Sequence, residues 1–180
     1  MKQFLFFLGF VVLLSGVYIS CQDNTLDTLR ENEIVALDKY VKDTGLTGAK
    51  DASGIYFKDL VVGTGDTIKS GYKVMLYFKI TMIDSTVIFT TEDLAGRNYE
   101  EFAFYVDVSN DLVNSSYVQQ IAGLHSGLKK MRVGGTAFMV IPSELAFKAV
   151  ETNTGYSTIP RFSTLLATVY AKKGYSPEDQ

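Results

Sequence analysis

The sequence has few of the residues on which most catalytic sites depend. Its 180 residues include one cysteine, one histidine, three prolines and no tryptophan. A net charge of −3 leaves no excess of basic residues, so we expect no nucleic-acid partner. The glycine-rich stretch at 45–54 lacks the spacing of a phosphate-binding loop, and no residues have the spacing of metal ligands. The sequence therefore predicts neither a metal nor a cofactor.

The single histidine offers no nucleophilic site. His125 and Ser126 are adjacent in a segment with helical periodicity, and adjacent residues on a helix do not face each other. They therefore lack the geometry of a base and its nucleophile. We expect the side chain of His125 to be exposed.

The chain begins with a long apolar run. Lys2 precedes residues 4–19, which are almost entirely apolar, and Ser20 and Cys21 follow. Such a stretch is typical of a signal peptide rather than of a membrane-spanning helix. Cys21 is then either incidental to an ordinary secretory signal or the modified residue of a lipoprotein.

The residues around this cysteine, Y-I-S-C, resemble a lipobox. The resemblance implies a lipoprotein signal peptide at 1–20 and a lipidated tether at 21–26, with acyl chains on Cys21. Two or more acyl chains give stable membrane anchoring. The protein would then be a lipid-anchored membrane protein of the bacterial cell envelope, on its periplasmic or surface side. No second cysteine is available for a disulfide.

The next segment has the pattern of an amphipathic helix. Residues 27–44 carry apolar side chains at roughly helical spacing, with Asp27 or Thr28 as a cap and Gly45 as a stop. The apolar stripe consists of Leu29, Ile34, Leu37 and Val41. It has two possible uses: packing on the downstream domain, or binding a partner or a second copy. Residues 27–51 are thus assigned as an amphipathic helix and linker.

Beyond Gly54 the pattern changes to alternation of apolar and polar residues, which is typical of strands. A single helical window interrupts this pattern at 117–131. The predicted strands cover 55–62, 73–82, 86–90, 101–108, 136–141 and 164–172. The pattern predicts an α+β fold, mostly antiparallel sheet with one short helix.

Three stretches then resemble one known family. They read SGIYFKDLVVGTGDTIKSGYKV from residue 53, IAGLHSGLKKMRVGGTAFMVIPSELAF from residue 121, and TIPRFSTLLATVYAKK from residue 158. Together they resemble the FKBP family of peptidyl-prolyl isomerases over residues 52–173, which leaves 174–180 as a tail. The resemblance implies an antiparallel β half-barrel wrapped over one short helix, preceded here by the N-terminal helix.

The resemblance also implies a pocket for a proline ring. On the family pattern, the catalytic positions are Tyr77, Phe89, Ile121, Phe147 and Ile159, where Ile121 would offer its backbone N–H to the substrate. The substrate-binding positions are Phe102, Phe104, Leu124 and Ala167. The sequence departs from the family at several of these: Leu124 stands for a tryptophan, Phe147 for a tyrosine and Ala167 for a phenylalanine.

Isomerisation of a prolyl bond requires no nucleophile, so the scarcity of reactive residues is compatible with it. Rotation about an amide is slow because resonance is lost, at a cost of about 18–20 kcal/mol. The two resemblances together imply an envelope-anchored isomerase that binds proline-containing peptides or unfolded protein segments and assists folding. Two alternatives remain: an inactive peptide- or protein-binding lipoprotein on the same fold, and a structural lipoprotein that assembles through its helix.

Overall fold

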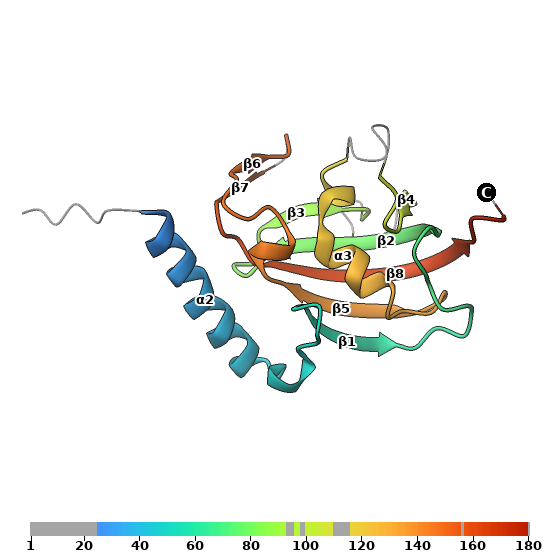
Figure 1. Cartoon of the computed structure of the whole chain (residues 1–180), viewed down its shortest axis with the longest axis horizontal. Helices are drawn as coiled ribbons and strands as arrows, with labels where there is room; N and C mark the ends of the chain where they lie inside the picture. The colour runs from blue at the N-terminus through green and yellow to red at the C-terminus, as the bar shows by residue number, and fades with distance from the viewer. Residues whose placement is uncertain (1–24, 93–95, 98–99, 110–115, 156, 180) are drawn as a thin grey trace, which may run out of the picture.

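The computed structural model describes residues 25–92, 96–97, 100–109, 116–155 and 157–179 (Figure 1). The predicted signal peptide and Cys21 lie outside these residues, so the predictions about them stay predictions. Within the described ranges, no helix is both long and apolar enough to cross a membrane.

A six-stranded antiparallel sheet forms the body of the fold (Figure 1). Its order is β1–β5–β8–β2–β3, and β4 pairs with β2 beside β3. These strands are β1 (Tyr56–Val61), β2 (Lys73–Met82), β3 (Val87–Thr90), β4 (Phe102–Tyr105), β5 (Thr136–Ile141) and β8 (Leu165–Tyr175). The predicted α+β class is confirmed.

The predicted strands at 73–82 and 136–141 match β2 and β5 residue for residue. The last strand is longer than predicted, because β8 continues to Tyr175 and so enters the predicted tail. A short pair, β6 (Thr152–Asn153) and β7 (Thr158–Ile159), was not predicted, since two-residue strands leave no periodicity in a sequence.

The predicted helical window at 117–131 divides in two. It contains the 3-10 helix η2 (Val118–Gln120) and the helix α3 (Ala122–Leu128). Ile121 lies between them in an extended conformation, with ψ of 98°. The chain therefore turns at Ile121, and the two pieces serve different parts of the structure.

Helix α3 covers one face of the sheet (Figure 1). The strands alternate, so that Val74, Leu76, Phe78 and Ile80 of β2 all turn toward this face and are buried. Gly123 and Gly127 lie directly against Ile141 and Met139, and a β-carbon at either glycine would collide with those side chains. The two glycines therefore let α3 approach β5 closely.

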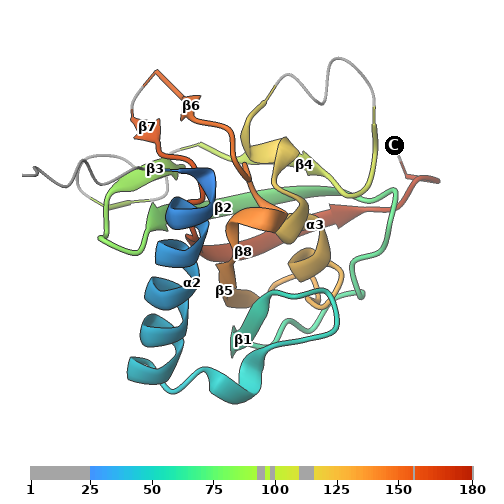
Figure 2. The same ribbon diagram turned by 60° about the vertical axis from the view of Figure 1, so that its left-hand side comes forward.

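The N-terminal helix α2 (Leu26–Asp43) packs against the other face (Figure 2). Leu37 and Val41 are buried there together with Tyr56, Val140 and Leu166, at the end where β5 stops and β8 starts. The helix thus packs on the downstream domain, the first of its two predicted uses.

Two details of the predicted helix are corrected. Its N-cap is Thr25, whose hydroxyl accepts a hydrogen bond from the Thr28 N–H, so the helix begins earlier than Asp27. Ile34, predicted to belong to the buried stripe, is 48% exposed. The apolar residues cover a wide sector of the helix surface, so their spacing does not indicate which of them face the sheet.

Two further 3-10 helices complete the described elements. Helix η1 (Thr47–Ala49) lies in the linker after α2, and η3 (Ser143–Leu145) follows β5 directly. The second of these comes from the I-P-S-E-L segment and leads into Phe147.

Candidate functional site

Four aromatic side chains line a cavity of about 420 Å³ beside the edge of the sheet formed by β3 and β4. They are Phe78, Phe89, Phe102 and Tyr117. Phe78 comes from β2, Phe89 from β3, Phe102 from β4, and Tyr117 from the turn just before η2. We call this the aromatic cavity. Of the nine predicted pocket residues, Phe89 and Phe102 line it.

The placement predicted for Tyr77 is corrected. Successive residues of a strand point to opposite faces, and Phe78 is the one that turns toward the core face. Tyr77 lies on the opposite face, where its ring stacks at 6.3 Å on that of Tyr170. The alternation of Val74, Leu76, Phe78 and Ile80 was the signal in the sequence that could have identified Phe78. No comparable signal marks Tyr117.

Phe147 lies next to the cavity and contacts two of its lining residues. Its ring centroid is 6.5 Å from that of Phe89 and 6.4 Å from that of Tyr117, the latter in an edge-on arrangement. Phe78 and Phe102 form a second edge-on pair at 5.4 Å. Such geometry is the favourable one for aromatic pairs. The rings thus support one another in forming the walls.

The remaining five predicted residues do not line the aromatic cavity. All are buried in the main core between α3 and the sheet, with exposures of 1% or less. They are Phe104, Ile121, Leu124, Ile159 and Ala167. The Ile121 N–H, predicted to bind substrate, donates a 3.3 Å hydrogen bond to the Val118 carbonyl.

Polar groups at the cavity tie its walls together. The buried hydroxyl of Thr91 accepts a hydrogen bond from the Phe78 N–H at 2.8 Å and lies 3.2 Å from the Phe78 carbonyl. Glu101 and Glu100 make the rim acidic. The Lys172 ammonium, which hydrogen-bonds Glu101, holds the pKa of that carboxyl below its usual value.

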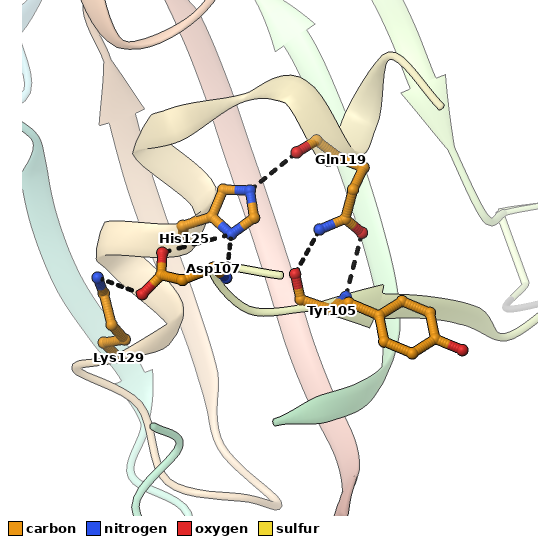
Figure 3. A network of polar contacts seen from close by, with 5 residues as sticks. All are labelled: Tyr105, Asp107, Gln119, His125 and Lys129. Carbon is orange, nitrogen blue, oxygen red and sulfur yellow. Dashed lines mark hydrogen bonds and ion pairs between the residues drawn. The ribbon is translucent and has the colours of Figure 1, made fainter. Parts of the chain in front are cut away.

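Figure 3 shows a network of polar contacts among Tyr105, Asp107, Gln119, His125 and Lys129. It fixes the segment that follows Tyr117. The buried side-chain amide of Gln119 in η2 bonds both the N–H and the carbonyl of Tyr105, which extends the pairing of β4. His125 of α3 connects η2 to the chain that follows β4. Its Nε2 donates to the Gln119 carbonyl at 2.8 Å, and its Nδ1 accepts from the Asp107 N–H at 2.9 Å.

The prediction that His125 is exposed is therefore wrong. Its side chain is 15% exposed, and its ring lies 4.7 Å from that of Phe104. Burial alone would raise the pKa of Asp107, but hydrogen bonds from Lys129 and Ser70 and the charge of Lys129 hold that pKa below its usual value. The network joins β4, η2 and α3, and so braces one side of the cavity.

The cavity has the chemistry of a binding site for an apolar ring. Its walls are aromatic, and within the described part of the chain no group of three histidine, cysteine or carboxylate side chains lies close enough to hold a metal ion. No nucleophile–base pair is placed at it. Aromatic side chains combined with placed polar groups, here Thr90, Thr91, Glu100, Glu101 and Ser116, are typical of small-ligand sites.

Comparison with known proteins agrees with this fold. The sequence profile of the family "FKBP-type peptidyl-prolyl cis-trans isomerase" matches residues 64–170. That match covers more than half of the chain, and the chain belongs to the FKBP-type peptidyl-prolyl cis-trans isomerase family. No curated protein matches the sequence significantly.

Solved structures share the fold at low sequence identity. FkpA from Escherichia coli is 24% identical, with a TM-score of 0.65, over 94% of this chain and 71% of its own. A peptidyl-prolyl cis-trans isomerase from Pseudomonas syringae pv. tomato is 19% identical, also with a TM-score of 0.65, over 86% of this chain and 98% of its own. The N-terminal domain of FKBP42 from Arabidopsis thaliana is 17% identical, with a TM-score of 0.53, over 68% and 87%.

Proposed function

We propose that the protein is a peptidyl-prolyl cis-trans isomerase that binds X-Pro segments in the aromatic cavity. The observation that carries the proposal is the cavity itself, a space of about 420 Å³ lined in part by Phe78, Phe89, Phe102 and Tyr117. A proline ring is compact and apolar, and aromatic walls bury it away from water. The natural substrates would be proline-containing peptides and unfolded protein segments.

The chemistry follows from the nature of the amide bond. A planar amide has greater charge separation than a twisted one, so transfer to an apolar cavity favours the twisted form relative to water. Uncatalysed X-Pro exchange takes tens to hundreds of seconds, slow enough to limit folding. The cavity would hold the proline ring while the residue before it rotates. No proton transfer or covalent intermediate is involved.

A binding module without catalysis is the second candidate, and two observations favour it. The N–H of Ile121 already donates to the Val118 carbonyl, and Phe147 has no hydroxyl to donate to a substrate carbonyl. Both donors that the family resemblance implies are therefore occupied or missing. A cavity that binds the ring but does not anchor a carbonyl would bind X-Pro segments with little acceleration.

One pair of measurements separates the two candidates. The full-length chain in detergent micelles is added to a protease-coupled assay with a proline tetrapeptide, and binding of the same peptide is measured by calorimetry. An isomerase accelerates the slow phase in proportion to its concentration. Binding with no acceleration would identify the binding module. Neither binding nor acceleration, in a chain folded by circular dichroism, would exclude both.

We further propose that the protein acts at a membrane of the bacterial envelope, on its periplasmic or surface side, anchored by acyl chains on Cys21. The apolar run at 4–19 and the Y-I-S-C sequence support this proposal. Expression in a bacterial host with a radioactive fatty acid should label the chain, and Cys21→Ser should remove the label and release the protein from the membrane fraction. Persistent labelling of the Cys21→Ser variant would contradict acylation at this residue.

A further inference from the structure

Glu33 of α2 makes three hydrogen bonds to residues far away in the sequence, just after β5 and just before β8. Its Oε1 accepts from the Ser143 N–H at 2.7 Å and from the Thr164 hydroxyl at 2.8 Å, and its Oε2 lies 2.6 Å from the Ser143 hydroxyl. Ser143 and Thr164 are buried, at 0% and 3% exposure. A partly buried carboxylate that accepts hydrogen bonds from three donors is a strong attachment.

Further hydrogen bonds extend from Ser143 into the loop that follows. The Ser143 carbonyl accepts from the N–H groups of Ala146 and Lys148, each at 2.9 Å. The Lys148 carbonyl in turn accepts from the Phe162 N–H at 2.8 Å. A continuous series of hydrogen bonds therefore runs from Glu33 through Ser143 and Lys148 to Phe162.

This series holds the backbone in an unfavourable conformation. Lys148 and Phe162 both have φ of 55°, in the left-handed region that residues other than glycine seldom adopt. Such residues persist where surrounding contacts hold them in place. The hydrogen bonds at the Lys148 N–H and the Phe162 N–H are the contacts that do so here. The shape of the loop thus depends on the position of Ser143, which Glu33 fixes.

Phe147 is enclosed in this loop, between Ala146 and Lys148. Its ring meets Phe89 and Tyr117 at the aromatic cavity. We propose that Glu33 is a positioning residue for the cavity: through Ser143 it sets the loop that places Phe147. On this proposal a single carboxylate connects the N-terminal helix to the loop that carries Phe147. The expected loss of isomerase activity rests on the proposed function. The expected change in amide hydrogen exchange of the loop does not.

The neighbouring ion pair does not have this role. Arg30 lies 2.9 Å from Glu144, but the two side chains are 53% and 47% exposed. Solvent-exposed ion pairs of this kind contribute little to the stability of the fold. The buried contacts of Glu33 are therefore the ones to perturb.

The test compares Glu33→Ala and Glu33→Gln with two controls in the full-length chain in detergent. Glutamine retains one acceptor oxygen, so it serves some of the three donors and should rescue part of the loss. Glu31→Ala removes an exposed carboxylate from the same helix. Leu37→Ala loosens the packing of α2 on the sheet without removing any hydrogen bond of Glu33.

Hydrogen exchange of the amides of Lys148 and Phe162 should rise about tenfold or more in Glu33→Ala, less in Glu33→Gln, and not in Glu31→Ala. Exchange in β2 and β8 should stay unchanged. In the isomerase assay kcat/KM should fall about tenfold to a hundredfold in Glu33→Ala. Leu37→Ala should lower thermal stability and leave kcat/KM near that of the parent.

Two results would overturn the proposal. One is loop exchange in Glu33→Ala equal to that of the parent. The other is an equal rise in exchange across loop and strands, with Leu37→Ala behaving in the same way, since that would mean general destabilisation. A parent chain without isomerase activity would refute the proposed function, and the exchange result would still decide the role of Glu33.

Discussion

Substitutions at two adjacent residues of β2 should differ in their effect on activity: one should lower it and the other should leave it unchanged. Phe78→Leu changes a buried ring that lines the aromatic cavity, whereas Tyr77→Leu makes nearly the same chemical change one residue away, on the other face. Leucine keeps much of the volume at position 78, and such swaps usually cost under about 1.5 kcal/mol of stability. The Phe78→Leu chain should therefore stay folded, so its activity can be measured.

The size of the effect follows from the aromatic interaction that the Phe78 ring provides. Phe78 makes an edge-on pair with Phe102 at 5.4 Å, and such aromatic pairs contribute about 0.5–1.5 kcal/mol beyond burial. If the proline ring makes a comparable contact in the transition state, removing it lowers kcat/KM about twofold to tenfold. Tyr77→Leu removes the stacking on Tyr170 and a hydroxyl contact with Glu101 on the rim, but it removes none of the four aromatic side chains that line the cavity. Its kcat/KM should equal that of the parent.

The assay is the protease-coupled measurement with a proline tetrapeptide, run on all three proteins after circular dichroism has shown equal folding. Calorimetry with the same peptide gives the binding constants in parallel. A larger loss in Tyr77→Leu than in Phe78→Leu would refute the placement of the site on the α3 face of the sheet. Equal losses in both would show that activity follows the stability of β2 and not the cavity.

Two further predictions concern stability. Leu37→Ala removes a buried side chain between α2 and the sheet, so urea unfolding should show a loss of about 2–4 kcal/mol, and an unchanged midpoint would mean that the helix is not docked in solution. Asp107 has a lowered pKa in the folded state, so its contribution is present above about pH 4, its unfolded pKa, and is lost as the pH falls through the folded value. Between pH 5 and pH 2 the parent should therefore lose slightly more stability than Asp107→Asn, by under about 1 kcal/mol because the pair with Lys129 is partly exposed. Parallel pH profiles for the two proteins would contradict that reasoning.

The fold was predictable because its signals are local. Alternation over ten residues is enough to predict β2, and the same pattern, followed more closely, indicates that Phe78 and not Tyr77 faces the core. The resemblance to the family aligned the strand correctly but assigned the pocket role to its neighbour. The two positions are adjacent, but adjacent residues of a strand point to opposite faces of the sheet, so the prediction placed the side chain on the wrong face.

The parts of the site that were not predictable depend on contacts between distant segments. Glu33 and Ser143 are separated by 110 positions, and no periodicity relates a carboxylate on one helix to a serine after a strand. Phe147 was predicted from the family, but its contacts with Phe89 and Tyr117 arise from the left-handed turn at Lys148. His125 was expected to be exposed because nothing in the sequence shows that η2 and β4 close over it.

The central position of β8 has a consequence for how the chain itself folds. This strand pairs with β2 on one side and β5 on the other, so the two halves of the sheet meet only through it. Its residues leave the ribosome about ninety residues after those of β2. Contacts between segments so far apart slow folding, because a long loop must close before they form. The sheet is therefore completed only after β8 has been synthesised, and until then the edge of β2 that pairs with β8 stays unpaired and open to aggregation.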